Sequence, residues 1–444
     1  MTRSNAENAF LEQFSACKAT LPAAGLPWLE GLREEAIAVF EELGIPTTRQ
    51  EDWRFTPLAK LAKTAFRAVE RTPSHELSST LIEECARAVG DARRVVFLNG
   101  IYSPELSSPG TLPAGVRIDS LAHTLEHEPE RLEPHLGRCA DPKTRAFTAL
   151  NTALASDGLF LELAPGAALD EPLHIVFIQH AGDASLALHP RNLVVAGRGS
   201  RARLIEHYLG SGVGTSLVNV VTEVLAGRDC QLEHIKLQQE TRSAYHIGGL
   251  MLRQEAGSRF VSHSLSLGGG LTRFDLQSVL GGELAHCTLN GLYLARETQH
   301  VDHHTTIDHA MPHTTSSEVY KGILDQDARG VFHGRIHVRP DAQKISAEQT
   351  NRNLLLSEGA IVNTKPQLEI YADDVRCTHG AAIGRLDEDA LFYLRSRGMD
   401  LENARSLLTF AFASEITRQL PIEGLRDYLE RFVLDWLPGA AGLR

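Results

Sequence analysis

Five six-residue stretches share one pattern: GSRARL at 199–204, GRDCQL at 227–232, GSRFVS at 257–262, GELAHC at 282–287 and GAIVNT at 359–364. In each stretch a turn glycine is followed three residues later by an apolar residue. The first four glycines are 28, 30 and 25 residues apart. Repeats of this length are typical of solenoids and propellers, in which stacked units bury apolar rows that one unit could not bury alone. The pattern therefore predicts a parallel β-helix.

The region around these stretches has the composition of strands. From about Leu159 to Gly384, short runs rich in Val, Leu, Ile and His alternate with Gly, Asp and Asn, and helical periodicity is almost absent. Strand alternation places Ala285, Cys287 and Leu289 on one face. We interpret Cys287, and Cys230 at the equivalent position of the repeat, as small buried side chains.

Helical segments flank this β region on both sides. Residues 1–158 are predicted to form a mixed, mostly helical domain, 159–384 the β-helix core, and 385–444 a C-terminal helical domain. Within the first segment, QEDWRF at 50–55 has the character of an exposed linker, and Arg94–Gly100 that of a short buried strand.

The C-terminal helices carry more apolar surface than their own packing requires. Asp400 is positioned to cap a helix whose apolar residues cover an unusually wide arc, and a second amphipathic helix begins near Pro421. The wide arc predicts that a partner covers part of the first helix. Its apolar residues are Leu401, Ala404, Leu407, Leu408, Phe410, Ala411 and Phe412.

Composition excludes several classes of protein. The chain has 444 residues, with Lys+Arg 44 against Asp+Glu 56 and a net charge of -12, which gives no reason to bind nucleic acid or an anionic membrane surface. No apolar run is long enough to span a membrane. The 6 cysteines contain no C-x-x-C pair and are expected to be reduced thiols of a cytoplasmic protein. The phosphate-loop, nucleophile-elbow and H-E-x-x-H motifs are absent.

The densest polar stretch runs from His300 to His313, HVDHHTTIDHAMPH. Imidazole and carboxylate groups are ligands for iron or zinc, so this stretch is a candidate metal site of a metal-dependent β-helix enzyme. The alternative is a structural role, because stacked strands also use His and Thr in hydrogen-bonded rows.

A second polar feature, DDVRCTHG at 373–380, lies at the end of the β region. If this segment is a strand, Cys377 and His379 project from the same face. A thiolate beside an imidazole suits a soft metal or an activated cysteine. Two ligands do not complete an iron–sulfur site, which usually takes four. Any cluster bound here would need ligands from another chain.

Six ordered motifs carry a resemblance to the SufB/SufD family of the SUF iron–sulfur cluster assembly system. They are SEVYKGI at 317–323, FHGRIHV at 332–338, Ala342-Gln343, QTNRNLLLS at 349–357, LEIYADDVRCTHGA at 368–381 and FYLRSRG at 392–398.

The resemblance implies a mainly β fold, a right-handed parallel β-helix flanked by N-terminal and C-terminal helical segments. It implies a non-catalytic scaffold in a SufB/SufD heterodimer, whose C-terminal helices bind the ABC-type ATPase SufC. Cys377 and His379 would lie at that interface and bind iron or a transient, shared cluster. The sulfur donor would act through SufB, and reduced flavin is a candidate electron source. Docking of SufC is assigned to Leu401, Leu407, Leu408, Phe410 and Phe412.

Two features favour the SufD branch over its paralogue SufB. The early cysteines Cys17, Cys85 and Cys139 are widely spaced instead of clustered, and QEDWRFT at 50–56 is similar to SufD. The paralogue SufB and the metal-dependent enzyme stand as the alternatives.

Overall fold

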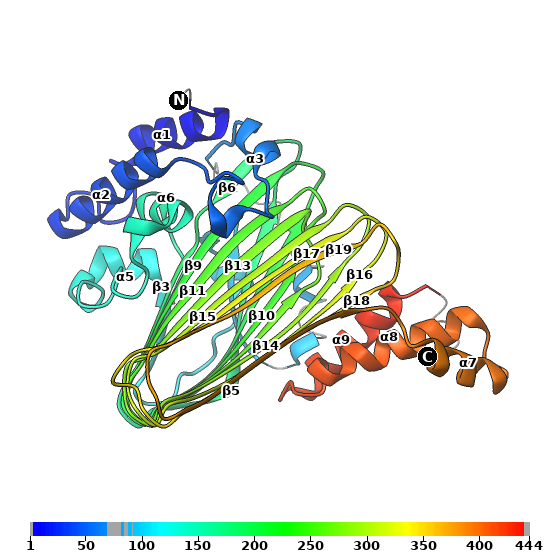
Figure 1. The fold of residues 1–444 in the computed structure, drawn as a ribbon. Helices are drawn as coiled ribbons and strands as arrows, with labels where there is room; N and C mark the ends of the chain where they lie inside the picture. Colours follow the sequence, from blue (N-terminus) through cyan, green and yellow to red (C-terminus); the bar gives the residue numbers. More distant parts are fainter. Residues whose placement is uncertain (1–2, 69–80, 84–87, 91, 439–444) are drawn as a thin grey trace.

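The computed structural model describes residues 3–68, 81–83, 88–90 and 92–438. Two stacked sheets form a parallel β-helix, with the N-terminal helices on one side and the C-terminal helices on the other (Figure 1). The predicted fold class is confirmed. Among the residues that the structure describes, no helix combines the length and apolarity needed to cross a membrane.

The first sheet contains the strand on which the candidate cysteine and histidine lie. Its pairs are parallel, except that β1 and β2 are antiparallel. In spatial order its strands are β2 (Ile101–Tyr102), β1 (Arg93–Leu98), β5 (Ala168–His180), β8 (Arg201–Ser211), β10 (Gln231–Gln239), β12 (Arg259–Ser266), β14 (His286–Ala295), β16 (Thr315–Leu324), β18 (Ile345–Leu355) and β20 (Val375–Gly384).

The second sheet faces the first across the lumen of the β-helix. Its β3–β4 pair is antiparallel, and the short strand β6 (Leu186–Leu188) pairs with β9. Its order is β19 (Ile361–Ile370), β17 (Arg329–Val338), β15 (His300–His309), β13 (Leu271–Leu280), β11 (Tyr245–Gln254), β9 (Ser216–Ala226), β7 (Arg191–Ala196), β4 (Leu159–Leu163) and β3 (Val116–Ser120).

The boundaries of the β region at 159 and 384 coincide with the start of β4 and the end of β20. The predicted strand at 94–100 is β1, which pairs with β5 and extends the first sheet. Strand β3 extends the second sheet through β4. The two sheets therefore begin within the N-terminal segment.

The coil register differs from the register suggested by the glycines. Gln231 pairs with Arg201, so the turn residue equivalent to Gly199 is Asp229, two residues beyond Gly227. Asp229 and Leu284 adopt positive φ angles of 59° and 61° where Gly199 and Gly257 have 66° and 69°. Because the turn does not require glycine in every coil, glycine spacing located the coils but not their exact register.

The interior of the β-helix is lined by alternate residues of both sheets. Ala285, Cys287 and Leu289 are fully buried in one cluster, as predicted. Cys230 is also buried, but it is not equivalent to Cys287, because Cys287 pairs with Phe260 and Phe260 with Leu232. Burial raises the pKa of both thiols to about 12. Both cysteines are therefore inert packing residues.

The N-terminal helices cover the outer face of the second sheet. The helices are α1 (Asn5–Cys17), α2 (Pro27–Leu43), α3 (Ala59–Lys63), α5 (Leu121–His127) and α6 (Ala146–Leu154), with 3-10 turns η1 (Glu51–Trp53), η2 (Pro104–Leu106), η3 (Pro129–Arg131) and η4 (Pro142–Thr144). The apolar residues of α1, α3 and α6 cluster with Leu217, Ile247 and Leu271 of the second sheet, and those of α5 cluster with Phe160 and Leu193.

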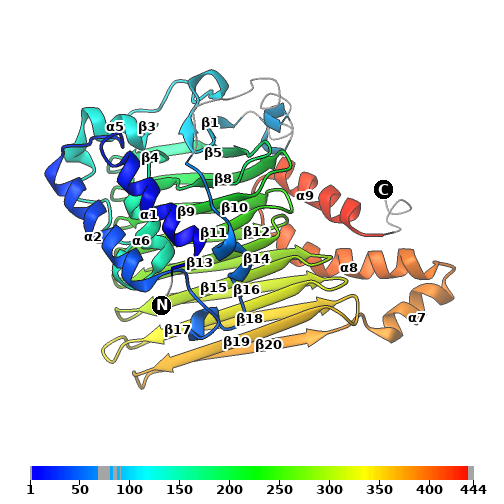
Figure 2. The ribbon, with the colours of Figure 1, turned by 90° about the horizontal axis from the view of Figure 1, so that it is seen from above.

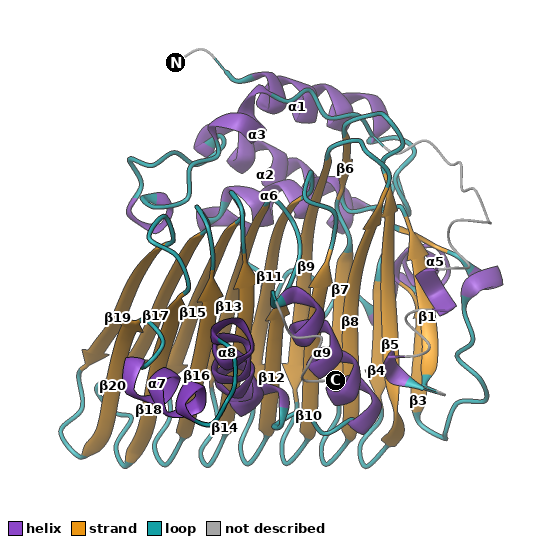
Figure 3. Ribbon diagram, turned by 90° about the vertical axis from the view of Figure 1, so that its right-hand side faces the viewer, coloured by secondary structure: helices purple, strands orange, loops and turns teal. Residues whose placement is uncertain are grey.

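The C-terminal helices are α7 (Glu388–Ser396), α8 (Leu401–Thr417) and α9 (Glu423–Trp436). Asp400 caps α8 by accepting a hydrogen bond from the Asn403 backbone N–H, as predicted. Figure 3 shows α8 and α9 lying across the outer face of the first sheet, where they share a cluster with Leu265, Leu292 and Ile323.

The β-helix ends with an uncovered coil. Strands β19 and β20 are the last strands of their sheets, and Figure 2 shows them at the end opposite β1. Apolar side chains that would be covered by a further coil are exposed instead, notably Ile370, Tyr371 and Ile383. This end is an open strand edge.

Candidate functional site

Cys377 and His379 lie on the edge strand β20, which confirms the strand predicted for this segment. Cys377 is paired with Ala347 and His379 with Gln349 on β18. Both partners are buried in the lumen. Since paired residues point to the same side of a sheet, Cys377 and His379 share the lumenal face of the uncovered coil.

The two side chains differ in their surroundings. Cys377 packs beside Ile336 and Ala347 at the edge of the last apolar cluster, and this partial burial raises the pKa of its thiol. His379 is exposed. The pair therefore joins a sheltered sulfur to an imidazole that solvent, or a partner, can reach.

His379 ends a polar row that starts deeper in the lumen. Pairing aligns Glu318, Gln349 and His379 on β16, β18 and β20. Gln349 Nε2 donates a 2.7 Å hydrogen bond to Glu318 Oε2. Burial raises the pKa of Glu318 to about 7, so this carboxyl can hold or release a proton near neutral pH.

Cys377 and His379 remain an incomplete ligand set. Within the described ranges of the chain, they belong to no group of three or more clustered His, Cys, Asp or Glu ligands. A cluster normally takes four ligands, so a second chain would have to supply the others.

The His300–His313 stretch is divided between the two faces of β15. His303 points into the lumen between Tyr293 and Tyr320, with ring centroids 5.4 and 5.2 Å away. His309 also lies inside and is hydrogen-bonded to Thr314 and Ser316. Burial lowers the pKa of His303 to about 3 and that of His309 to about 4. These two histidines are structural.

His300 and Asp302 of β15 face outward, toward the N-terminal segment. Asp302 is fully buried there and accepts hydrogen bonds from Thr56 and from Arg273, the latter at 2.9 Å. Burial raises the pKa of Asp302, but His304 and Arg273 overcome it and hold the carboxyl ionised. Most of the segment 50–55 is exposed, as predicted, but it is held to the sheet: Trp53 is half-buried and stacks 3.9 Å from the Arg273 guanidinium.

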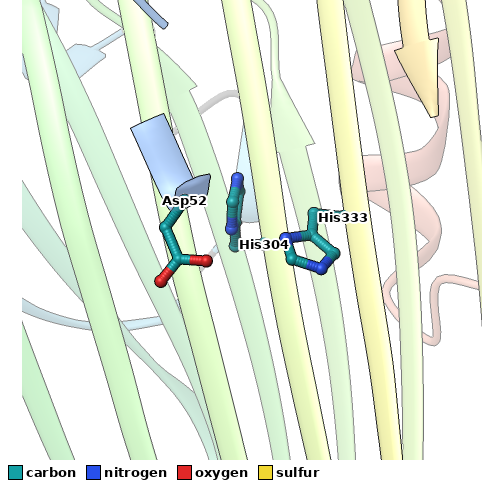
Figure 4. A group of neighbouring side chains, drawn as sticks. All are labelled: Asp52, His304 and His333. Carbon is teal, nitrogen blue, oxygen red and sulfur yellow. The ribbon is translucent and has the colours of Figure 1, made fainter. Parts of the chain in front are cut away.

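The packing of η1 on the sheet brings together three potential metal ligands that were not predicted from the sequence. Asp52 of η1, His304 of β15 and His333 of β17 each offer one ligand atom, and these atoms lie within 4.8 Å of one another. Figure 4 shows the Asp52 carboxylate and the His333 ring on either side of the His304 ring. The sequence singled out 50–56 and His300–His313 separately, but nothing in it indicated that they meet.

The residues expected to dock a partner are only partly available. Leu401 is 46% exposed, whereas Leu407, Leu408, Phe410 and Phe412 are half-buried, and Phe410 and Phe412 pack on the apolar cluster beneath α8. Two neighbours on α7 are more open: Phe392 is 75% and Tyr393 58% exposed. The exposed apolar surface is therefore centred on α7 and the start of α8.

Two family models cover almost the whole chain. The SufBD core domain of the SUF system for iron–sulfur cluster assembly matches residues 177–412, and the SufBD N-terminal region matches residues 4–175. The chain belongs to the SufBD family.

Individual SufBD relatives are similar to this chain along most of their length. A SufBD family protein of Synechocystis sp., named as an iron–sulfur cluster assembly protein, is 33% identical over 90% of this chain and 89% of its own. The iron–sulfur cluster assembly protein SufD of Escherichia coli is 31% identical over 90% of both chains. SufD of Bacillus subtilis is 26% identical over 96% of this chain and 97% of its own. The resemblance stated from the sequence is confirmed.

Proposed function

We propose that this SufBD protein is the non-catalytic SufD-type scaffold of a SUF complex, joined to SufB through the open end of its β-helix and to the ATPase SufC through its C-terminal helices. The observation that carries the proposal is the lumenal pair Cys377 and His379 on an uncovered edge strand. A site that is incomplete in one chain and exposed at a strand edge suits a cluster shared between two chains.

The open coil supports pairing with another β-helix. Strands β19 and β20 each leave one row of backbone N–H and C=O groups without a neighbouring strand. Such edges pair readily with strands of another chain. Exposed Ile370 and Ile383 on the lumenal side of this coil would be covered by the SufB β-helix, together with Cys377 and His379.

The chemistry of the pair fits a ligand role for iron acquisition and cluster assembly. The partly buried Cys377 thiol favours its neutral form, so binding of iron or a cluster would release its proton. His379 would supply an imidazole ligand or accept that proton. SufB would supply the remaining ligands and receive the sulfur, and the cluster would leave as product.

The C-terminal helices provide a route from the ATPase to this site. α8 lies on the first sheet, where Lys321 of β16 donates a hydrogen bond to the Phe412 carbonyl. β16 is two strands from β20. Movement of SufC subunits at α7 and α8 would therefore be transmitted toward the open coil. The described cysteines, all free thiols, support a cytoplasmic location.

Cluster formation on the purified complex tests the ligand role. We expect His379→Ala and Cys377→Ser to reduce cluster yield at least about tenfold while the SufB heterodimer still assembles. Thr378→Ala, on the opposite face of the same strand, should leave the yield unchanged. Assays with reduced flavin and with a chemical reductant separate electron supply from ligation. Normal yields from both site variants would remove the pair from the mechanism.

Co-purification tests the docking surface. Phe392→Glu and Leu401→Glu should abolish binding of SufC, because each places a charge on exposed apolar surface without disturbing the core. Leu284→Glu is the matched control, since Leu284 is 67% exposed in a turn of the β-helix. SufC binding that survives both α7–α8 changes would locate the ATPase elsewhere.

A further inference from the structure

We propose that Asp52, His304 and His333 form a binding site for a divalent transition metal, with Fe(II) as the best match. The site lies on the outer face of the second sheet and is distinct from Cys377 and His379. Two imidazoles and one carboxylate that leave coordination positions open are the donor set typical of non-haem Fe(II). The proposal does not depend on the shared-cluster function.

The contact of His304 with Asp302 leaves the other ring nitrogen of His304 available. Its Nε2 lies 3.0 Å from Asp302 Oδ1. An ionised carboxylate only accepts hydrogen bonds, so Nε2 carries the hydrogen and Nδ1 presents its lone pair. A metal-binding histidine normally has such an acceptor behind it, which fixes the ring and its tautomer. Arg273 and Thr56 in turn hold Asp302.

His333 is arranged in the same way. Its Nε2 lies 3.3 Å from the side-chain amide oxygen Oε1 of Gln367, and Gln367 Nε2 donates to Glu369 at 2.9 Å. This second bond fixes the amide with its oxygen toward His333, so Nδ1 of His333 also presents a lone pair.

Asp52 completes the set from a distant part of the chain. Its backbone carbonyl accepts a 2.6 Å hydrogen bond from Arg273, and the neighbouring Glu51 pairs with Lys365 of β19. These contacts hold η1 over the sheet. The Asp52 carboxylate itself makes no hydrogen bond to the described residues and is exposed, so it can turn toward an ion.

The spacing suits closure around an ion. Ligand atoms at about 2.0–2.2 Å from one metal lie roughly 3–3.5 Å apart, and the three atoms here lie within 4.8 Å. Asp52 is exposed, so its side chain can rotate to bring its carboxylate to an ion. A surface pocket of about 420 Å³, lined in part by Asp52, Trp53 and Arg273, gives solvent access beside the group.

Metal titration of the isolated full chain tests the site. The protein carries Cys377→Ser, so that its thiol cannot contribute, and is titrated with Fe²⁺ without oxygen and with Co²⁺, whose visible spectrum reports coordination by nitrogen and oxygen. We expect one ion per chain. Asp52→Asn and His333→Gln should each weaken binding at least tenfold and remove the rise in Tm that the ion produces.

The matched control is His337→Gln, on the same strand and face but held by Asp308. It should bind the ion as the parent does. Absence of saturable binding in the parent, or unchanged affinity in both Asp52→Asn and His333→Gln, would overturn the proposal. Because neither SufB nor SufC is present, this result is independent of whether Cys377 and His379 bind a cluster.

Discussion

Gln349 Nε2 donates a 2.7 Å hydrogen bond to Glu318 Oε2, and pairing places His379 next in the same lumenal row. The buried carboxyl therefore lies in the same row as the candidate cluster ligand, with one amide side chain between them in the strand register. Because burial raises the pKa of Glu318 to about 7, the charge at the inner end of this row changes near neutral pH.

Replacement of Glu318 by Gln should change how stability depends on pH. Between pH 4.5 and about 7 the folded protein keeps a proton on Glu318 that the unfolded chain releases, so stability falls as pH rises through this window. Above this pH window, the resulting loss in the free energy of unfolding is on the order of 3 kcal/mol. Glu318→Gln should therefore raise Tm at pH 8 and have much less effect at pH 5. An equal shift in Tm at both pH values would contradict this assignment.

Gly334 should be required for the same hydrogen bond. A Cβ at this position of β17 would overlap the Gln349 amide across the lumen. Gly334→Ala should displace Gln349 from Glu318 and destabilise the fold by about 1–3 kcal/mol. The measurement is urea unfolding, with Gly380→Ala as control because a Cβ there meets no atom within 4 Å. Equal stability of the two variants would show that Gln349 adapts without loss.

His303→Phe should stabilise the β-helix, most strongly in acid. Neither ring nitrogen of His303 has a hydrogen-bond partner among the described residues, and its pKa is lowered by burial to about 3. As pH falls below 6.5, His303 binds a proton in the unfolded chain but not in the folded chain, so the folded state loses stability. The stabilisation by His303→Phe, measured as free energy of unfolding, should therefore increase by about 3 kcal/mol as the pH is lowered from 7 to 4.

The control for this prediction is His127→Gln, exposed on α5. Urea unfolding at both pH values gives the comparison. A loss of stability in His303→Phe at pH 7 would show that this imidazole makes a favourable interaction, and that its role is more than filling the lumen.

Lys321 should anchor α8 to the β-helix. Its Nζ donates to the Phe412 carbonyl at 3.2 Å, lies 4.2 Å from the Phe412 ring and pairs with Glu415. Lys321→Met should loosen α8, which hydrogen exchange of the α8 amides would detect, and cost about 1–3 kcal/mol. Arg352→Met is the control, because Arg352 is exposed and 3.8 Å from Glu415, and such pairs contribute about 0–1 kcal/mol. Equal exchange in both variants would contradict the anchoring role.

Features governed by local rules were predictable from the sequence. Strand periodicity put Cys377 and His379 on one face, and Asp400 was recognisable as the cap of α8. These results depend on residues a few positions apart, for which the chemistry of one segment is sufficient. The parallel β-helix was predictable because its repeat recurs as a local pattern along the chain.

Relations between distant segments were decided only by the tertiary structure. The sequence could not show that Asp229 and Leu284 replace glycine in the coil turns, because pairing between coils holds them in positive φ. Likewise, His303 and His304 are adjacent in the chain but point to opposite sides of β15, and His304 meets Asp52 only when η1 folds onto the sheet. Such contacts depend on how whole elements stack. The free energy of this stacking is distributed over many residues, so no single motif in the sequence encodes it.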